Sequence, residues 1–311
     1  MPPVARRDQR IAQLKRRVAD LARSRLTMAE QPSFIVRLNE ERRLRQLEVE
    51  IGAPSRSVIA GGKFHVYDLV RSHGVEVPEQ LGRWEDPADI PWDDLPDAVV
   101  IKSAFSAASR GVLPLRRVEG GWQIATRDTT VTSQQLTAEL AELASEGTAR
   151  PPFGAEELLD DGSGGPPVDV KVYSFYGESP VALLRRVDEH GGSGAAAHRF
   201  IDPHGRDLVE EYRGKPTDPS IPVPASCGEI FDLASRVSLA IRVPFSRIDV
   251  YDIHGRIVFG EVTPRPGGPQ WLGDDLDVSL GDAWERAQVR LWADIANGMS
   301  PKPEWGPSGQ E

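Results

Sequence analysis

The chain contains a single cysteine, Cys227, among its 311 residues. One thiol cannot form an internal disulfide bond, and no second cysteine stands at a ligand spacing, so a thiolate zinc site is excluded. No uninterrupted apolar run approaches the roughly 18 to 20 residues that a membrane-spanning helix needs. No apolar segment follows the basic N-terminal residues in the manner of a secretory signal. These absences predict a cytoplasmic protein without a membrane span.

Histidine is scarce as well, with six residues and no H-x-x-x-H pair. No Ser-His-Asp or Cys-His signature indicates covalent catalysis. The formal net charge is −10, so the surface is not expected to attract nucleic acid or an anionic membrane. The sequence therefore favours a chemistry that does not depend on a side-chain nucleophile.

Basic residues are concentrated near the start of the chain, where residues 1–25 hold eight Arg or Lys against two Asp. Apolar residues recur there at the spacing of one helical face, which predicts a helix with a basic side; they are Ile11, Leu14, Val18 and Leu21. A basic helical face is ordinarily solvated surface, and an anionic partner is the alternative.

Helical and strand-like patterns mix along the rest of the chain, without an internal repeat. Hairpins outnumber βαβ units, which predicts an α+β or mixed α/β fold. The expected helices cover 40–50, 63–73, 132–147, 228–241 and 282–298, and a disordered tail rich in Pro and Gly is expected after the last of them. The stretch VDVKVYSFYGESPVALLRRV predicts two strands joined by a turn that contains glycine.

The stretch SRIDVYDIHGRIVFGEVTPRPGG, residues 246–268, is predicted to form a β-hairpin. A three-residue loop at 253–255 would end on the glycine that such a loop needs in the left-handed conformation. Asp249 then lies diagonal to Glu261, and Arg247 lies opposite Glu261, because side chains alternate with period two. A two-residue loop would instead place the two acids on opposite faces.

Two carboxylates on one face, about 7 to 8 Å apart or less, can bind a hard divalent cation through oxygen. Mg²⁺ typically takes one or two protein carboxylates and completes its octahedron with phosphate oxygens and water. Asp249 and Glu261 are the candidate ligands, with the hydroxyl of Thr263 beyond them. The alternative is a partly exposed sheet face with an Arg247–Glu261 ion pair, which would add little stability.

Two lysines stand where they could reach phosphate groups. Lys102 ends the apolar strand AVVIK, just before the small-residue loop SAFSAASRG, although a lysine at a strand end is usually an edge residue. Lys171 lies inside the apolar strand VDVKVYSFY, where an unpaired ammonium would be costly. Its partner is either Asp169 on the same face or a phosphate, and the sequence does not separate the two.

The order of these pieces resembles the ATP-grasp superfamily and, within it, the TupA-like family, which is similar to teichuronopeptide-biosynthesis proteins. The resemblance covers roughly residues 60 to 290. Its most specific pieces are FSRIDVYDIHGRIVFGE and VTPRPGG. Weaker pieces are GGKFHVYDLVRSHGVEVPE, LPDAVVIKS, EELL, DVKVYSFYGE and HRFIDPHGRDL.

The resemblance implies ATP held between two lobes with antiparallel sheets. It divides the chain into an N-terminal helical segment (1–55), a pre-ATP-grasp region (56–95), a small ATP-binding lobe (96–155), a large lobe with the metal site (156–300) and a flexible tail (301–311).

The resemblance also implies roles for individual residues. Asp249 and Glu261 would carry Mg²⁺, with Thr263 where many ATP-grasp enzymes use an asparagine. The residues expected to contact ATP are Lys102, Ser106, Arg110, Glu156, Glu157, Leu158 and Lys171; those expected to act on the transferred phosphoryl group are Arg247 and Arg265; those expected at the substrate are Arg199, Gly267 and Gly268.

One piece departs from the family pattern. The phosphate-covering loop is typically rich in glycine, whereas SAFSAASRG offers only Gly111 and adds Arg110. Serine hydroxyls such as that of Ser106, together with Arg110, are expected to contact phosphate in place of backbone groups.

The implied activity is ATP-dependent ligation. ATP would phosphorylate a carboxylate on a small molecule or saccharide, and an amine would attack the acyl phosphate to give an amide, ADP and phosphate, in polysaccharide modification or secondary metabolism. Phosphoryl transfer suits the residues, because it needs positioning and charge neutralisation more than a nucleophile. The alternatives are an ATP-grasp kinase acting on a hydroxyl and a nucleotide-binding regulator with weak catalysis.

Overall fold

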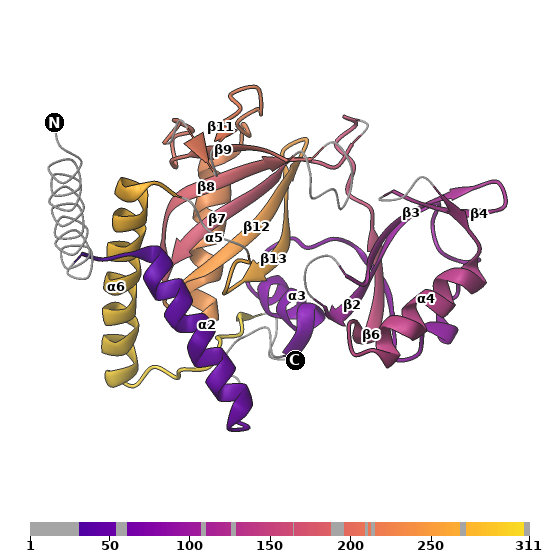
Figure 1. The fold of residues 1–311 in the computed structure, drawn as a ribbon, viewed down its shortest axis with the longest axis horizontal. Coiled ribbons are helices and arrows are strands. Elements are labelled where there is room, and N and C mark those ends of the chain that lie inside the picture. The colour runs from indigo at the N-terminus through magenta and orange to yellow at the C-terminus, as the bar shows by residue number, and fades with distance from the viewer. Residues whose placement is uncertain are drawn as a thin grey trace, which may run out of the picture.

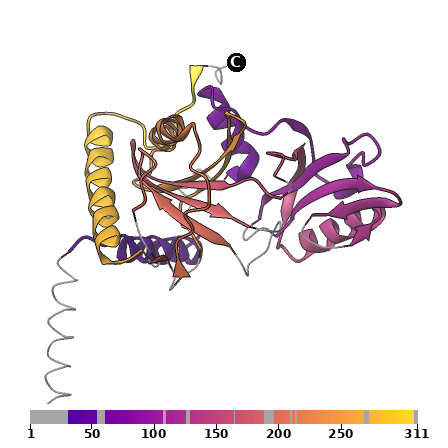
Figure 2. The same cartoon turned by 90° about the horizontal axis from the view of Figure 1, so that it is seen from above.

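The structure is a computed structural model that describes residues 31–53, 61–106, 110–125, 129–163, 165–187, 196–208, 211–212, 215–267 and 272–307. The helix expected over residues 11–21 lies outside these ranges. The chain forms two lobes, each built on an antiparallel sheet (Figure 1; Figure 2). The mixture of helices with antiparallel sheets confirms the predicted α+β (mixed α/β) class.

The small lobe contains a six-stranded sheet with the strand order β1-β6-β2-β3-β4-β5. One helix, α4 (Ser133–Ser145), covers it. Trp122, Phe153 and Leu140 are fully buried in the core between them. The strands are β1 (Gln80–Trp84), β2 (Ala98–Phe105), β3 (Val112–Val118), β4 (Gly121–Ile124), β5 (Thr130–Val131) and β6 (Arg150–Glu157), with a short 3-10 helix, η2 (Pro87–Asp89), before β2.

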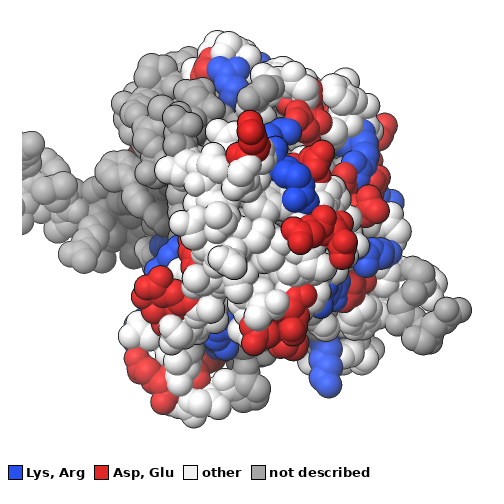
Figure 3. Space-filling view, turned by 90° about the vertical axis from the view of Figure 1, so that its right-hand side faces the viewer, with Lys and Arg blue, Asp and Glu red and all other residues white. Residues whose placement is uncertain are grey.

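Helix α4 begins where the sequence predicts a Thr or Ser cap. The Thr132 hydroxyl accepts a hydrogen bond from the Gln135 backbone, and the Gln135 side chain accepts one from the Thr132 backbone. This reciprocal capping box satisfies two N–H groups that the first helical turn leaves without partners. The outward face of the small lobe carries Asp and Glu side chains beside Lys and Arg side chains (Figure 3). The residues drawn in colour on that face are therefore mixed in charge.

The large lobe contains a five-stranded sheet with the order β13-β12-β7-β8-β9. Helix α5 (Cys227–Ile241) packs on one face, while α2 (Phe34–Glu50) and α6 (Asp274–Ala296) cover part of the other. The strands are β7 (Asp169–Phe175), β8 (Glu178–Arg186), β9 (Ala197–Ile201), β12 (Ser246–Ile253) and β13 (Arg256–Thr263); β10 (Glu211–Tyr212) and β11 (Lys215–Pro216) form a separate two-stranded sheet. The turn between β7 and β8 contains Gly177, as predicted.

The two faces of this sheet differ in composition. On the α5 face, Val172, Ile248 and Val250 are buried in one apolar core together with residues of α3 (Gly62–Ser72). On the other face, aromatic side chains pack beneath α2 and α6, and charged side chains occupy the remainder. Helix α3 lies between the two sheets, where it contacts β2 and β13 (Figure 1).

Helix α2 begins earlier than the predicted 40–50 helix. The Ser33 hydroxyl accepts a hydrogen bond from the Val36 backbone, so Ser33 is the N-cap. Phe34 then enters the core beneath the helix, which the charged sequence after residue 40 did not indicate. Tertiary packing of this first turn therefore extends the helix.

The loop of the β12–β13 hairpin differs from the prediction. Ile253 pairs with Arg256, so the loop has two residues, His254 and Gly255, with φ values of 55° and 87°. Both are positive, as a type I′ turn requires. A β-bulge at Gly260 adds one residue to β13. This extra residue offsets the shorter loop, so Asp249 and Glu261 still lie on the same face of the sheet. Asp249 consequently pairs directly with Glu261 rather than lying diagonal to it.

The structure describes the tail after Gly298 as far as residue 307, and its expected disorder stays a prediction. Residues 300–306 make hydrogen bonds to α3 and to the end of α5, while residues 308–311 lie outside the described ranges. Across the described residues, no helix is both long and apolar enough to cross a membrane.

Candidate functional site

The charged part of the large-lobe sheet is centred on Asp249, in the middle of β12. Lys171 Nζ donates to Asp249 Oδ2 at 2.6 Å, and Arg247 donates from Nε to Oδ1 at 2.6 Å and from Nη2 to Oδ2 at 2.7 Å. Lys171 also forms an ion pair with Asp169. The register explains the cluster, because Lys171 of β7 is the direct neighbour of Asp249. Burial disfavours ionisation of Asp249, but Arg247 and Lys171 outweigh it and hold the pKa of this carboxyl below its ordinary value.

Glu261 faces Asp249 from β13, and its electrostatic situation is the opposite. Desolvation, followed by repulsion from Asp249, raises the pKa of the Glu261 carboxyl. Glu261 is nevertheless exposed, because it borders a cavity. Asp249 is thus an acid neutralised by two cations, whereas Glu261 is an acid without a bound cation among the described side chains.

This cavity lies between the two lobes and has a volume of about 490 Å³. Helix α3 contributes Lys63 and Tyr67, while the small lobe contributes four polar or basic residues. The edge strand β13 contributes the stretch from Phe259 to Val262, including Glu261. These polar or basic small-lobe residues are Ser106, Arg110, Thr148 and Arg150. The cavity therefore has a cationic side from α3 and the small lobe, and an acidic side from β13.

A profile of the TupA-like ATPgrasp family matches residues 42–285. The chain belongs to the TupA-like ATP-grasp family. This confirms the resemblance that the sequence motifs indicated, and the antiparallel sheets on either side of the cavity form the ATP-grasp fold.

Several solved structures of ligases are similar to this ATP-grasp chain at low identity. ATP-grasp ligase PsnB complexed with a minimal precursor is 18% identical, over 73% of this chain and 60% of its own, with a TM-score of 0.42. D-alanine–D-alanine ligase from Bacillus anthracis complexed with ATP is 15% identical, over 80% and 74%, with a TM-score of 0.45. L-amino acid ligase from Bacillus licheniformis is 14% identical, over 72% and 46%, with a TM-score of 0.42. A search of curated proteins found no match.

Of the residues predicted to contact ATP, Ser106 and Arg110 line the cavity. Lys102 instead forms an ion pair with buried Glu156 and donates to the hydroxyl of Tyr67 at 3.0 Å. Burial lowers the pKa of Lys102, but attraction to Glu156 outweighs burial and the net pKa is raised. Lys102 is therefore charged and lies behind Tyr67, which itself lines the cavity.

Lys63 is a cavity residue that the sequence argument missed. Its ammonium donates to the Ser106 hydroxyl at 2.7 Å and to the backbone oxygens of Ser103 and Ser106 at 3.4 and 3.3 Å. Burial lowers its pKa, and attraction to Glu261 opposes that effect. Lys63 lies in GGKFHVYDL, one of the stretches that resemble the family, and that position could have indicated a role at the site. Arg150, at the start of β6, was missed as well and carries no comparable signal.

Glu157 is the last residue of β6 and Leu158 follows it, at the passage between the lobes. Glu157 is paired with Arg256 of β13, and its carboxylate accepts from the Glu79 backbone at 3.0 Å. The hydrogen bond from Arg256 lowers the pKa of Glu157. Arg256 also pairs with Glu76. Glu157 thus links β13 to the small lobe, and a contact of Glu157 or Leu158 with adenine or ribose stays a prediction.

The remaining predicted residues are distributed between the cluster and the surface. The hydroxyl of Thr263 accepts from Arg247 at 3.1 Å, so it belongs to the cluster through Arg247. Arg265 is half-buried, and burial followed by the nearby Arg45 lowers its pKa. Arg199, on β9, pairs with Asp207 and donates to two backbone carbonyls, and it does not line the cavity. Gly267 is exposed, while Gly268 lies outside the described residues.

The acidic side of the site fits a divalent cation in one respect. Asp169, Asp249 and Glu261 carry three negative charges against the two positive charges of Lys171 and Arg247, and the buried Oδ1 of Asp169 has no hydrogen-bond partner. Within the described ranges, no three His, Cys, Asp or Glu side chains are grouped to hold a metal by themselves. A cation here would therefore need phosphate oxygens and water to complete its coordination, which is how Mg²⁺ binds with nucleotides.

Proposed function

We propose that this protein is an ATP-dependent carboxylate–amine ligase that forms an amide through an acyl phosphate. One observation carries the proposal: a cavity between the lobes has Lys63, Arg110 and Arg150 on one side and Glu261 on the other, next to the Asp249 cluster. Cations facing an unpaired carboxylate suit a polyphosphate that binds together with a divalent metal. Membership of the ATP-grasp family supports ATP as the phosphate source.

The cationic side would bind the phosphates of ATP. Lys63 is already fixed by Ser106, so its ammonium needs little reordering to reach a phosphate oxygen. Arg110 is exposed at the end of the glycine-poor loop, where a guanidinium can form paired hydrogen bonds to phosphate. Lys102 and Lys171 contribute positive charge from the second layer, because carboxylates of the protein occupy their ammonium groups.

Glu261 and Asp249 would hold Mg²⁺, which neutralises charge on the transferred phosphoryl group when it is bound. The two acids have different tasks in this proposal. Glu261 offers its carboxylate directly to the cavity, whereas Asp249 must share its oxygens with Lys171 and Arg247. Thr263 holds Arg247 by a hydrogen bond, and we assign it no contact with the metal.

Arg247 and Arg265 would act on the acyl phosphate. Arg247 is oriented by Asp249 and Thr263, so its guanidinium is held rigidly beside the two acids. Arg265 follows in the TPRPGG stretch, where Pro264 and Pro266 restrict the backbone. A rigid guanidinium suits the planar carboxylate of an acid substrate through a bidentate contact. The substrate class is an acid and an amine, which can be small molecules or parts of a saccharide.

The test combines a chemical trap with a substitution. Purified protein is incubated with ATP, Mg²⁺ and a panel of carboxylic acids, with hydroxylamine in place of the amine. ADP release should require an acid, and the acyl phosphate should appear as a hydroxamate. Arg265→Lys should lower kcat/KM for the acid at least about tenfold while the KM for ATP changes little. Lysine keeps the positive charge but cannot form the two parallel hydrogen bonds that a guanidinium makes to a carboxylate. Arg43→Lys, on the exposed side of α2, is the matched control and should behave as the unaltered protein.

Phosphorylation of an alcohol without any hydroxamate would contradict the ligase and support a kinase. Binding of ATP without ADP release, with every acid and amine tried, would support a regulator. Equal kcat/KM in Arg265→Lys and Arg43→Lys would remove Arg265 from the acid site.

A further inference from the structure

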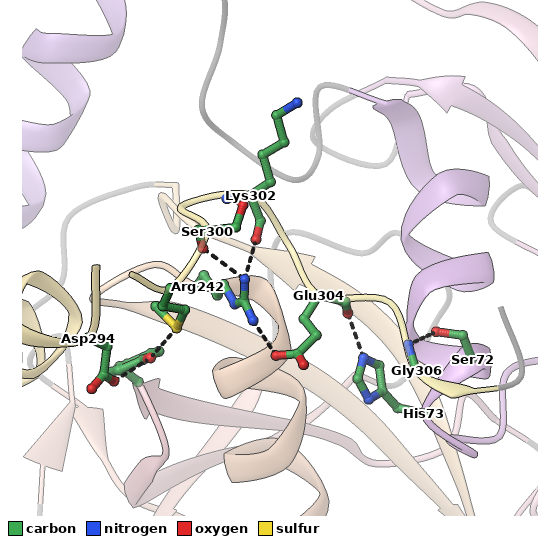
Figure 4. Close-up of polar contacts among 10 residues, drawn as sticks. Ser72, His73, Arg242, Asp294, Ser300, Lys302, Glu304 and Gly306 are labelled. Atoms are coloured by element: carbon green, nitrogen blue, oxygen red, sulfur yellow. Dashed lines mark hydrogen bonds and ion pairs between the residues drawn. The ribbon is translucent and has the colours of Figure 1, made fainter. Parts of the chain in front are cut away.

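Residues 300–306, which we call the strap, follow α6 and run across the end of α5 to α3 (Figure 4). The chain enters it at Met299, whose backbone donates to Asp294 of α6. The hydroxyl of Tyr176, in the β7–β8 turn, donates to Asp294 Oδ2 at 2.8 Å and contacts Met299 Sδ at 3.3 Å. The strap therefore begins from a point that is fixed on the large lobe.

Arg242, just after α5, attaches the strap to the large lobe. Its Nη1 donates to the backbone oxygens of Ser300 and Lys302 at 2.8 and 3.1 Å, and its Nη2 pairs with the carboxylate of Glu304 (Figure 4). The Glu304 backbone in turn donates to the oxygen of Ala240 at 2.9 Å. One guanidinium thus holds three points of the strap.

The backbone of Arg242 is unusual in a way that points to the same role. It caps α5 in the left-handed conformation, with φ 58° and ψ 48°. Glycine is the usual residue at this position, because a side chain there is strained. The chain accepts an arginine at this position, and its side chain contacts the strap at Ser300, Lys302 and Glu304. Holding the strap is therefore the evident use of a side chain at position 242.

The other end of the strap is attached to α3. The Gly306 backbone donates to the Ser72 hydroxyl at 2.8 Å, and the His73 ring is 2.6 Å from the Glu304 oxygen (Figure 4). The ring of Trp305 packs edge-on against His65, with centroids 5.4 Å apart. Glycine is required at 306, because a Cβ there would overlap the backbone oxygen of Ser72. The strap is therefore fitted closely to α3.

The opposite side of α3 forms a wall of the cavity. Lys63, Val66 and Tyr67 line the cavity, and Lys63 holds the loop at Ser106 by hydrogen bonds. Tyr67 also receives the hydrogen bond from Lys102. A shift of α3 by a fraction of an ångström would move all three cavity residues together, since a helix moves as one body.

We propose that the strap positions the nucleotide-binding wall: by tying α3 to α5 through Arg242 and Gly306, it holds Lys63 and Tyr67 where ATP binds. Arg242 and Gly306 are positioning residues in this proposal and do not contact ATP. The proposal rests on the proposed function, because it takes the cavity to be the nucleotide site. It extends that function to a part of the chain beyond the family match, which ends at residue 285.

The experiment compares three variants of the full chain by the Kd for AMPPNP with Mg²⁺ and by hydrogen exchange of α3. Arg242→Gly removes the three strap contacts and suits the left-handed backbone, so α5 itself is not disrupted. Gly306→Ala breaks the close approach at Ser72. Lys302→Ala is the matched control, because only the backbone oxygen of Lys302 contacts Arg242 and its side chain points away from the strap contacts (Figure 4).

Arg242→Gly and Gly306→Ala should each raise the Kd about tenfold, within the range usual for coupling between two sites. Lys302→Ala should stay within about twofold of the unaltered protein, as expected for a substitution that touches no contact. Amides of α3 should exchange faster in the first two variants, while those of β8 should not, and saturating AMPPNP should reverse the change. In turnover, the KM for ATP should rise while kcat stays close to its original value.

Faster exchange of α3 with an unchanged Kd would overturn the proposal, since the strap would then only stabilise the fold. Unchanged exchange of α3 would overturn it too, because another contact would be holding the helix. Failure of the proposed nucleotide site is distinguishable, as it would appear in the unaltered protein as absence of AMPPNP binding, whereas failure of the ligase reaction alone would leave AMPPNP binding intact and appear in the hydroxamate assay. Absence of AMPPNP binding would overturn the nucleotide role of the strap together with the ATP site.

Discussion

One face of the large-lobe sheet is divided into two halves that share the same strands. Toward one end, Tyr173 of β7 lies with Phe245, Phe34 and Trp284 in an aromatic core beneath α2 and α6, with ring centroids 4.8 to 6.0 Å apart. Two residues earlier on β7, Lys171 begins the ionic half with Asp249 and Arg247. The change from aromatic to ionic thus takes place within one strand.

The two halves differ in what they contribute to stability. The aromatic half buries apolar surface, which contributes roughly 25 cal/mol for each Å² removed from water. The ionic half must offset the desolvation of its charges, and buried ion pairs of this kind are often no better than apolar replacements. Stability therefore does not explain the ionic half, and its position beside the cavity does.

The largest effect is expected for Asp249→Asn, which breaks the ionic half. Removal of this carboxylate leaves Lys171 and Arg247 buried without their shared anion. The free energy of unfolding should fall by roughly 3 to 5 kcal/mol, measured by urea denaturation, because breaking a buried pair leaves uncompensated charge. ADP formation should be lost as well. A loss of less than about 1 kcal/mol would mean that water already solvates the cluster.

Glu261→Gln is the matched control within the same half. Desolvation by the surrounding protein and repulsion from Asp249 already disfavour its charged form, so a neutral side chain should leave the unfolding free energy about unchanged. ADP formation should still fall about 100-fold or more, the usual size for a lost electrostatic contact in the transition state. Normal turnover in this variant would show that Glu261 is not a ligand of the metal.

Phe34→Ala tests the aromatic half. This ring is fully buried and contacts Tyr173, Phe245 and Trp284. Its removal should cost about 3 to 5 kcal/mol of unfolding free energy, the usual loss for a buried phenylalanine. The kcat/KM of the folded fraction should stay within about twofold, since the aromatic half contributes stability alone. Val36→Ala, at an exposed position on the same helix, is the control. A large loss of kcat/KM in Phe34→Ala would mean that the aromatic half also contributes to activity.

The smallest effect is expected for Glu157→Gln. This substitution tests whether the partly exposed Glu157–Arg256 ion pair contributes as much stability as the buried cluster. Arg256 depresses the pKa of Glu157 below its ordinary value of about 4.5, so the pair stabilises the fold above that pH. The contribution is lost as the pH falls through the lower folded-state pKa. At pH 7 the substitution should cost about 0.5 to 1 kcal/mol, discounted for solvent screening.

The thermal melting curves of Glu157→Gln and the unaltered protein should therefore differ at neutral pH and converge below about pH 4. Glu119→Gln, at an exposed position on the small lobe, should show no such convergence. A difference in melting temperature that is constant from pH 3 to pH 8 would contradict the role of the Glu157 charge.

Local patterns were sufficient to predict many elements. The apolar spacing in α5, the Thr132 cap of α4 and the glycine after α6 each determine a helix boundary from a few neighbouring residues. The strands on either side of Gly177 were predicted for the same reason. Phe34 could not be placed, because its burial depends on α6, more than 240 residues later in the chain.

The site was predictable in part. Alternation along β12 and β13 brought Asp249 and Glu261 to one face, although the predicted loop was wrong and the bulge at Gly260 compensated for it. The ion pair of Lys102 with Glu156 could not be predicted, because it joins two strands whose register is set by the whole small-lobe sheet. Lys63 was missed for a similar reason, since only the packing of α3 between the lobes brings it to the cavity.

The bulge at Gly260 has a further consequence for how molecules of this protein meet one another. Strand β13 is the outer strand of its sheet, and an outer strand offers unpaired backbone groups to which a second chain can add. A bulge interrupts that row and twists the strand locally, and the Phe259 N–H is already bonded to the oxygen of Glu76. The irregularity that sets two carboxylates opposite each other therefore also protects the sheet from edge-to-edge aggregation.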